Sequence, residues 1–289
     1  MRFITYSSDL DSGLGVLVPG EPDLFVSVPG LAMLGLIRLG EEGLKRAHGA
    51  LMAGPKRSLA SVTLSAPIPE LRRNVFCLGW NYAEHSKEAA HLRGKDVKLP
   101  ERPVFFTKAT TTVNGPYSDI PVDARVSEQN DWEVELGVII GTVGKNIPRE
   151  RALEHIFGYT VINDVSARDV QTAHGKQFFK GKSLDGYCPM GPWIVTRDEV
   201  LDPHALPLRC RVNGELKQEG NTKDLIFDIP AIITWLSLGL TLLPGDVIAT
   251  GTPSGVGFAR TPPEYLWPGD VVECEVEGIG LIRNRIVSA

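Results

Sequence analysis

The alternation of apolar and polar positions is clearest at residues 132–140, where it predicts a β-strand. Apart from two glutamates and one glycine, this stretch is apolar and rich in β-branched residues. Side chains of a strand alternate between its faces, so Glu133 and Glu135 project from one face and the intervening apolar residues from the other. Two neighbouring carboxylates repel each other, and a bound cation would relieve that repulsion. A solvated edge strand with two exposed acids is the alternative.

The first 66 residues form a pattern of their own. Two strands are predicted near the N-terminus, and residues 31–53 carry helical spacing. No acids, histidines or lysines there combine at a catalytic spacing, so we predict a packing or dimerisation domain. The extended segment 66–69 contains two prolines and predicts a boundary between this small domain, residues 1–66, and a larger domain, residues 70–289.

The larger domain consists mainly of short strands separated by turns. Its clearest elements are a hairpin at residues 208–219, whose turn is Asn213-Gly214, and a helix that Asp228 caps. Many short strands with few helices predict an α+β fold that is mainly β.

His85 and Glu88 follow a predicted buried strand at residues 74–79. If a short helix begins near Tyr82, the two side chains share a face, and the carboxylate raises the basicity of the imidazole as a general base for water requires. A surface pair without a role is the alternative. The polar segment 91–102 predicts a mobile loop that could act as a lid.

Asp164 stands near the end of another apolar strand, residues 159–165, and is a candidate third ligand. An aspartate that caps the following turn is the alternative. Three oxygen ligands with room for water fit Mg²⁺ or Mn²⁺ and not Zn²⁺, because no cysteine or histidine is among them. Arg168 and Gln171 are three residues apart and could hold a substrate carboxylate, unless Arg168 only pairs with an acid such as Asp169.

Two further segments carry candidate chemistry. Lysines flank the glycine of Lys180-Gly181-Lys182, and a lysine near a metal can stabilise an enolate or oxyanion. Two solvated loop lysines are the alternative. The glycine-rich segment 251–257 lacks the lysine and the following helix of a phosphate loop. Its glycines allow the backbone and the Thr252 hydroxyl to approach a ligand closely.

The composition narrows the class of protein. Of 289 residues, 43% are hydrophobic and 22% charged, which is typical of a globular protein with a large core. The formal net charge is −5 without a basic block, so we expect no nucleic-acid partner. Four widely spaced cysteines indicate reduced thiols. The longest apolar run, residues 31–37, is too short to span a membrane, so we predict a cytoplasmic protein without a membrane partner.

Several motifs together resemble the fumarylacetoacetate hydrolase superfamily over residues 70–287. They are Gly79-Trp80-Asn81-Tyr82-Ala83-Glu84-His85, Asp131-Trp132-Glu133-Val134-Glu135-Leu136-Gly137, Asn163-Asp164-Val165-Ser166-Ala167-Arg168-Asp169, Gly181-Lys182-Ser183, Val212-Asn213-Gly214 and Thr250-Gly251-Thr252-Pro253-Ser254-Gly255-Val256-Gly257. The resemblance implies a mixed β-roll behind a small N-terminal α/β domain, and a homodimer.

The resemblance also implies roles for individual residues. The implied ligands of Mg²⁺ or Mn²⁺ are Glu133, Glu135 and Asp164. The implied catalytic residues, of which the first two activate water on a lid that orders when ligand binds, are His85, Glu88 and Lys182. The implied substrate-binding residues are Arg168, Gln171, Thr252 and Lys108.

We therefore predict a metal-dependent hydrolase that cleaves a carbon–carbon bond in 2,4-dioxo acids of the acylpyruvate or fumarylpyruvate type, giving pyruvate and a carboxylic acid. Glu88 would orient His85, which would take a proton from water for attack on the distal carbonyl. The alternatives are an oxaloacetate decarboxylase or keto–enol tautomerase, and an isomerase or decarboxylase of homoprotocatechuate degradation. A metal-bound binding protein without catalytic activity is the remaining alternative.

Overall fold

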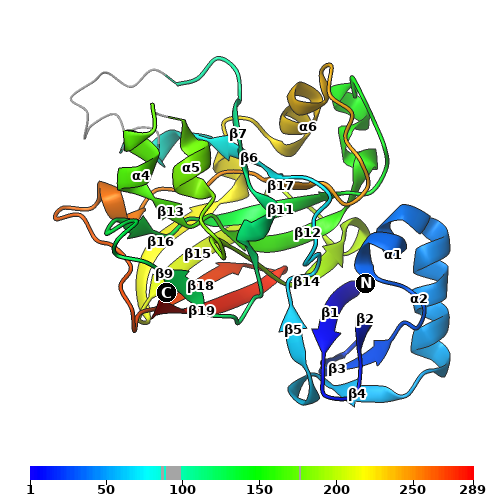
Figure 1. The fold of residues 1–289 in the computed structure, drawn as a ribbon. Helices are drawn as coiled ribbons and strands as arrows, with labels where there is room; N and C mark the ends of the chain where they lie inside the picture. The colour runs from blue at the N-terminus through cyan, green and yellow to red at the C-terminus, as the bar shows by residue number, and fades with distance from the viewer. Residues whose placement is uncertain (86–87, 89–98, 176) are drawn as a thin grey trace.

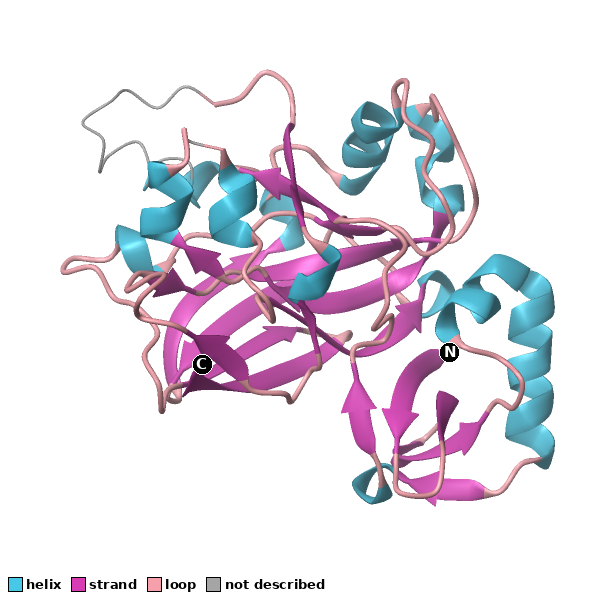
Figure 2. Cartoon of the chain, in the orientation of Figure 1, coloured by secondary structure: helices cyan, strands magenta, loops and turns pink. Residues whose placement is uncertain are grey.

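The computed structural model describes residues 1–85, 88, 99–175 and 177–289. Figures 1 and 2 show a large body built mainly of strands with short helices outside it, and a smaller lobe that contains the N-terminus. This architecture confirms the predicted α+β fold that is mainly β. Much of the segment predicted as a lid, residues 91–98, lies outside the described residues.

The N-terminal lobe is an antiparallel run of strands with two helices beside it. Its elements are β1 (Arg2–Ser7), β2 (Ser12–Val18), β3 (Glu21–Ser27), α1 (Met33–Leu39), α2 (Glu41–Ala53), β4 (Lys56–Ser58) and β5 (Thr63–Ser65). The helical pattern of residues 31–53 corresponds to α1 and α2. They separate at Gly40, whose φ of 54° lies outside the range of a right-handed helix.

The main sheet of the described chain has twelve strands, in the order β4-β3-β2-β1-β14-β12-β11-β17-β6-β7, with β5 paired to β1 and β8 to β14. Its strands outside the lobe are β6 (Val75–Gly79), β7 (Val104–Lys108), β8 (Val113–Asn114), β11 (Val134–Ile140), β12 (Ile156–Asn163), β14 (Cys188–Thr196) and β17 (Val247–Ala249). Strand β11 lies between β12 and β17, and both glutamates are buried, so they are not exposed on a solvated edge strand.

A second sheet of five strands has the order β16-β15-β18-β19-β9. The strands are β9 (Ile120–Val122), β15 (Pro207–Val212), β16 (Glu215–Asn221), β18 (Val271–Val276) and β19 (Gly280–Ser288). The predicted hairpin corresponds to β15 and β16. The remaining elements used below are β10 (Asn130–Asp131), β13 (Ser166–Ala167), α4 (Arg168–Ala173), α5 (Phe178–Lys182) and α6 (Ile229–Ser237), and Asp228 caps α6 as predicted.

Every residue of strand β11 is buried, and its two faces contribute to different hydrophobic clusters. The face that includes Trp132 and Val134 packs into one cluster, and Ile139 on the opposite face packs into another. The regular strand begins at Val134 and not at residue 132. The reason is local: the backbone N–H of Glu133 donates to the side chain of Asn163 and leaves the regular ladder there.

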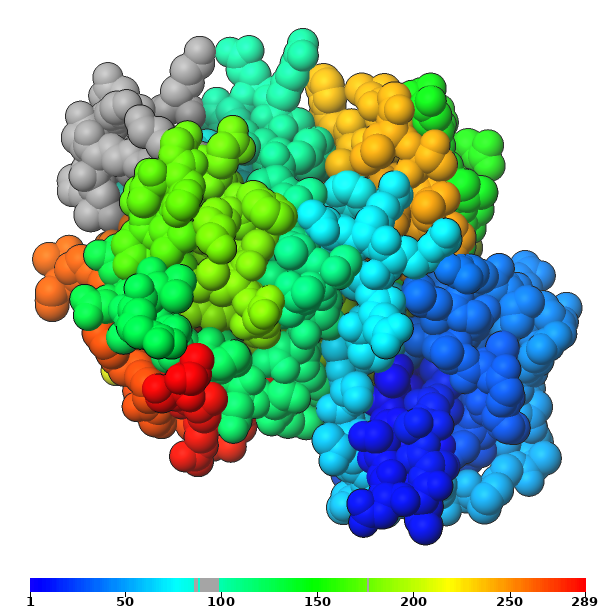
Figure 3. Space-filling view, viewed as in Figure 1, coloured from blue at the N-terminus to red at the C-terminus, as the bar shows by residue number. Residues whose placement is uncertain are grey.

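The N-terminal lobe is joined to the larger body through the main sheet. Strand β1 pairs with β14, with Phe3 opposite Ile194. Residues from both parts also share one hydrophobic cluster. Figure 3 shows the lobe at one side of the molecule, in blue. The domain boundary at residues 66–70 stays a prediction. None of the helices in the described ranges combines the length and apolar character that a membrane span needs.

Candidate metal centre and active site

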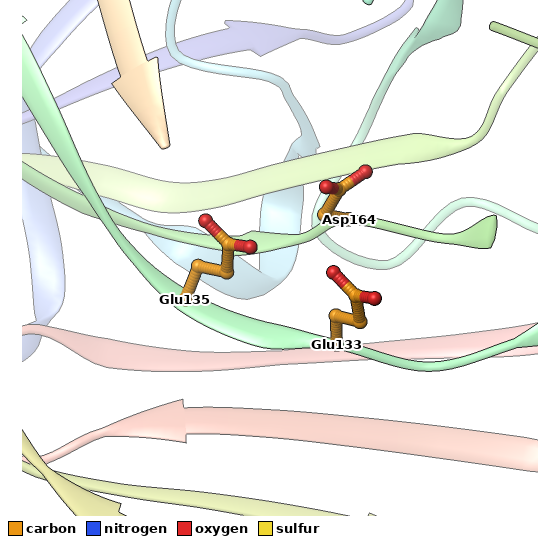
Figure 4. Close-up of side chains that lie close together, drawn as sticks. All are labelled: Glu133, Glu135 and Asp164. Atoms are coloured by element: carbon orange, nitrogen blue, oxygen red, sulfur yellow. The ribbon is translucent and has the colours of Figure 1, made fainter. Parts of the chain in front are cut away.

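Glu133, Glu135 and Asp164 come together where β11 and β12 lie side by side. Each offers one carboxylate oxygen, and these oxygens lie within 4.8 Å of one another. Figure 4 shows the three side chains projecting into the same space. The register accounts for this arrangement. Val134 is opposite Asn163, so Glu133 and Asp164 each stand one residue beyond that pair, and the Asp164 N–H donates to the Glu133 carbonyl at 2.9 Å.

The three carboxylates have different surroundings. Burial raises the pKa of Glu133, but attraction from Lys182, Arg168 and His85 outweighs it and brings the value to about 2. Burial, with repulsion from Asp164 and Glu133, raises the pKa of Glu135 well above its usual range. One oxygen of Glu135 accepts from the Gly251 N–H at 2.7 Å, whereas its buried Oε1 has no hydrogen-bond partner among the described residues.

Two buried lysines contact the acid cluster. The Lys182 ammonium donates to Glu133 Oε2 at 2.7 Å and to Asp164 Oδ2 at 2.8 Å. Lys108 donates to Asp164 Oδ1 at 2.5 Å and to the Val165 carbonyl at 3.0 Å. The alternative of a solvated loop lysine is therefore excluded for Lys182. The amine of Lys108 holds Asp164, and a contact of Lys108 with substrate stays a prediction.

Arg168 is buried at the start of α4 and lies between two acids. Its Nε donates to Asp131 Oδ2 at 2.8 Å and its Nη2 to Glu133 Oε1 at 2.6 Å. A third nitrogen donates to Gln171 Oε1 at 3.4 Å, and the guanidinium carbon lies 4.4 Å from the ring centroid of Phe258. The partners of Arg168 are therefore Asp131 and Glu133 and not Asp169. Binding of substrate by Arg168 and Gln171 stays a prediction.

The glycine-rich segment 251–257 binds carboxylates through its backbone N–H groups. Gly255 donates to both oxygens of Glu88, at 3.0 and 3.2 Å, and Gly257 donates to Asp131 at 2.6 Å. With the Gly251 bond to Glu135, one segment fixes three acids. Position 255 requires glycine for two reasons. Its φ of +96° is rarely adopted by other residues, and a Cβ there would collide with the carbonyl oxygen of Lys217.

His85 and Glu88 lie beside this segment. The Nδ1 atom of His85 is 3.7 Å from Glu88 Oε2, which is longer than a hydrogen bond. His85 is buried, its Nδ1 has no hydrogen-bond partner among the described residues, and its ring packs edge-on against Phe258 at a centroid distance of 6.4 Å. The two residues are thus close to each other, and His85 is near enough to Glu133 to contribute to the lowered pKa of that carboxyl.

Thr252 is also buried, but its hydroxyl is already bound within the protein. It donates to the Val134 carbonyl at 2.9 Å and accepts from Gln218 Nε2 at 2.8 Å. Gln218 accepts in turn from the Val134 N–H at 3.0 Å and so joins β16 to the start of β11. In the described structure Thr252 supports the strand that carries the glutamates, and its contact with substrate stays a prediction.

Two buried polar residues of the site were not among the predicted ones. Asp131 accepts from Arg168 and from the glycine segment, and Gln218 joins β16 to β11. A signal existed for Asp131, because it is an acid directly before the two-glutamate strand. For Gln218 the sequence offers no signal, since the rest of β16 is mostly exposed or half-buried.

The residues at the centre fit a small divalent cation. Ligands on opposite sides of Mg²⁺ are about 4.2 Å apart, so a cluster within 4.8 Å needs little adjustment to hold one ion. An ion would also give the buried Oε1 of Glu135 the partner that it lacks. All three donors are carboxylate oxygens, which Mg²⁺ and Mn²⁺ prefer.

The sequence model of a protein family, described as the fumarylacetoacetate (FAA) hydrolase C-terminal region, matches residues 74–287. The chain belongs to the fumarylacetoacetate hydrolase family. A solved structure of this family, the fumarylacetoacetate hydrolase EaFAH from psychrophilic Exiguobacterium antarcticum, is 41% identical with a TM-score of 0.84 over all of both chains. The fold expected from the resemblance is therefore confirmed.

Two curated relatives are named for the same activity. "Oxaloacetate tautomerase YisK" of Bacillus subtilis (strain 168) is 47% identical over 229 residues, covering 79% of this chain and 74% of the relative. "Oxaloacetate tautomerase Fahd2a, mitochondrial" of Rattus norvegicus is 42% identical over 281 residues, covering 96% and 86%. A solved maleylpyruvate hydrolase from Sphingobium sp. SYK-6, in complex with manganese(II) ion and pyruvate, is 29% identical with a TM-score of 0.81 over all of both chains.

These relatives correct the predicted activity. We predicted a hydrolase of 2,4-dioxo acids, but these two relatives, at 47% and 42% identity, are named oxaloacetate tautomerases, which agrees with the alternative prediction. The motifs that carry the resemblance contain the three acids of the cluster and His85. Such a site can support several reactions, because the motifs do not specify which substrate bond reacts.

Proposed function

We propose that the protein is a divalent-metal-dependent keto–enol tautomerase of oxaloacetate. The observation that carries this proposal is the match to relatives named for that activity, at 42% identity over 96% of the chain in one case. The cluster of Glu133, Glu135 and Asp164 supports the need for a metal.

Mg²⁺ or Mn²⁺ held by the three acids would supply binding positions for the carboxylate and 2-oxo oxygens of the substrate and stabilise negative charge on the latter. The Sphingobium structure supports this assignment, since its manganese accompanies pyruvate, a 2-oxo acid. The metal and its three ligands remain part of the proposal.

The charges of the centre suit an anionic substrate once a metal is bound. Four buried acids, Asp131, Glu133, Glu135 and Asp164, face three buried cations, Lys108, Arg168 and Lys182. When all four acids are ionised, they exceed these cations by one negative charge, and a divalent ion bound among them leaves an excess of one positive charge. A dicarboxylate such as oxaloacetate is attracted to that positive charge.

Tautomerisation transfers a proton and consumes no water. The C3–H bond of the keto form breaks, an O–H bond forms at the 2-oxo oxygen, and the reverse reaction restores C3–H. His85 is the residue we assign to move the proton, because it is buried beside the cluster and its Nδ1 has no hydrogen bond among the described residues. Glu88, fixed by the Gly255 N–H, lies 3.7 Å from His85 Nδ1 and would attract the imidazolium that forms when His85 takes up the proton, and the Lys182 ammonium stabilises charge on the substrate oxygen.

The test supplies enol-oxaloacetate to the purified protein and measures the keto form with NADH-dependent malate dehydrogenase. We expect keto formation to accelerate in proportion to enzyme concentration with Mg²⁺ or Mn²⁺ present, to return to the uncatalysed rate with a chelator, and to recover when metal is restored. No acceleration with either metal would contradict the proposal. Stoichiometric release of pyruvate would also contradict it, because it would indicate a decarboxylase.

A further inference from the structure

Asp131 is a buried acid that contacts the centre without belonging to the proposed ligands. Its Oδ1 accepts from the N–H groups of Trp132 at 2.8 Å and Gly257 at 2.6 Å. Its Oδ2 accepts from the Phe258 N–H at 3.1 Å and from Arg168 Nε at 2.8 Å. Four donors therefore fix this carboxylate, and the bonds from the backbone N–H groups of Gly257 and Phe258 prevent it from following Arg168 if that side chain moves.

The backbone explains why Asp131 and Arg168 meet. Asp131 lies in β10, which pairs with β13 in an antiparallel ladder that places Asp131 opposite Ser166. Arg168 follows β13 directly, and Glu133 follows β10 after one residue. The short ladder thus places the guanidinium between an acid that is fixed by the backbone and an acid that is a proposed metal ligand.

Arg168 divides its hydrogen bonds between these two acids. One nitrogen, Nε, donates to Asp131, and another, Nη2, donates to Glu133. Arginine and a carboxylate readily form a pair with two parallel hydrogen bonds, and a buried guanidinium has no water to balance its charge. Without the charge of Asp131, Arg168 would therefore pair with Glu133 through two of its N–H groups.

We propose that Asp131 is a positioning residue for the metal centre, because it holds Arg168 Nε and so limits that arginine to a single hydrogen bond with Glu133. The carboxylate oxygens of Glu133 then remain able to bind a divalent ion. The inference rests on the metal site of the proposed function, but it does not depend on which reaction the protein catalyses.

The first variant is Asp131→Asn, which keeps the size of the side chain and removes its charge. The side-chain oxygen of asparagine can still accept from the Gly257 N–H. Its amide nitrogen, which is a donor, then faces Arg168 Nε, which is also a donor. We expect the dissociation constant for Mn²⁺, measured by isothermal titration calorimetry on the full chain, to rise about 10- to 100-fold, as is typical when a residue that orients a ligand is removed.

A double-mutant cycle with Arg168→Gln tests the route of this effect. The Arg168→Gln variant lacks the competing guanidinium, so we expect its dissociation constant for Mn²⁺ to be at most about threefold higher than that of wild type. In that background Asp131→Asn should change the affinity by less than about threefold. An equal loss in both backgrounds would overturn the inference, because Asp131 would then act without Arg168.

The chain offers a matched control in Asp246. This aspartate is buried, accepts from Arg73 Nε at 2.8 Å and accepts from the Leu243 N–H at 2.7 Å, but it has no bond to the acid cluster. Asp246→Asn should lower thermal stability and leave the Mn²⁺ affinity unchanged. If both aspartate variants weaken Mn²⁺ binding equally, general destabilisation accounts for the loss and the inference is wrong.

The remaining outcomes separate this inference from the proposed function. If the wild-type protein and Asp131→Asn bind Mn²⁺ equally well, the inference is wrong and the proposed function is unaffected. Wild type that binds no Mn²⁺ contradicts the metal site and with it the inference. If Asp131→Asn does not fold, the Arg168→Gln variant still tests the inference. A loss of more than tenfold in its Mn²⁺ affinity would show that Arg168 supports the metal site and does not compete with the ion, and the inference would be wrong.

Discussion

In two regions of this protein an arginine lies between a carboxylate and an aromatic ring. In the N-terminal lobe, Arg57 donates to both oxygens of Asp11, at 2.6 and 2.9 Å, and its guanidinium carbon lies 4.9 Å from the ring centroid of Tyr6. At the acid cluster, Arg168 is bonded to two acids and lies over Phe258. Both regions therefore combine a guanidinium, a carboxylate and an aromatic ring.

The two regions differ in the polar atoms around the arginine. No buried side-chain nitrogen or oxygen of residues 1–66 lacks a hydrogen-bond partner, all of those residues being described. Around the acid cluster, atoms without a partner among the described residues are Tyr82 OH, His85 Nδ1, Glu135 Oε1 and Asn163 Nδ2. Each such buried atom costs about 1–3 kcal/mol. The buried polar side chains of the lobe thus have their hydrogen-bond partners within the protein, whereas several of those around the acid cluster do not.

The largest effect is expected from Glu135→Ala, which removes the acid with the free oxygen. Metal ions contribute several kcal/mol of transition-state stabilisation, so activity should fall to the uncatalysed rate and Mn²⁺ binding should be lost. Calorimetry and the tautomerase assay measure the two effects. Glu154→Ala, at an exposed glutamate, is the control and should match wild type. Unchanged Mn²⁺ affinity in Glu135→Ala would show that the cluster is not the metal site.

His85→Ala should separate proton transfer from metal binding. We expect kcat to fall about 10²- to 10⁴-fold, the usual contribution of a general acid–base group, while Mn²⁺ affinity stays close to wild type. Steady-state kinetics and calorimetry on the same preparation measure both. A variant that keeps full activity would remove His85 and Glu88 from the mechanism.

Lys182→Met should also lower kcat, by about 10²- to 10³-fold, because a preorganised positive charge is lost. Its effect on the metal is expected to be opposite to that of Glu135→Ala. The ammonium no longer occupies Glu133 Oε2 and Asp164 Oδ2, so Mn²⁺ should bind at least as tightly as in wild type. Loss of Mn²⁺ binding would mean that Lys182 maintains the cluster and does not compete with the ion.

The smallest effect is expected from Asp11→Asn in the N-terminal lobe. Arg57 forms hydrogen bonds with the carboxylate and lowers the pKa of Asp11, but Asp11 is exposed and Arg57 only half-buried, and pairs open to solvent contribute little to stability. We expect the melting temperature to change by no more than a few degrees and activity to be unchanged. Reduced Mn²⁺ affinity would contradict the view that this arginine pair is only structural.

The sequence predicted those parts of the site that follow from local periodicity. Alternation along β11 placed Glu133 and Glu135 on one face, and an acid at the end of the neighbouring strand supplied Asp164. The contact between Asp131 and Arg168 spans 37 residues and depends on the pairing of β10 with β13, which no local pattern specifies. The reaction itself was mispredicted, because the motifs describe the metal centre and not the part of the substrate that differs between hydrolases and tautomerases.

Anomalous diffraction from crystals of the wild-type protein grown with Mn²⁺ would test the central claim most directly. We predict one strong anomalous peak within coordination distance of the carboxylates of Glu133, Glu135 and Asp164, with one of its contacts to Glu135 Oε1. A map with no peak among these carboxylates, or with manganese bound only elsewhere, would contradict the account.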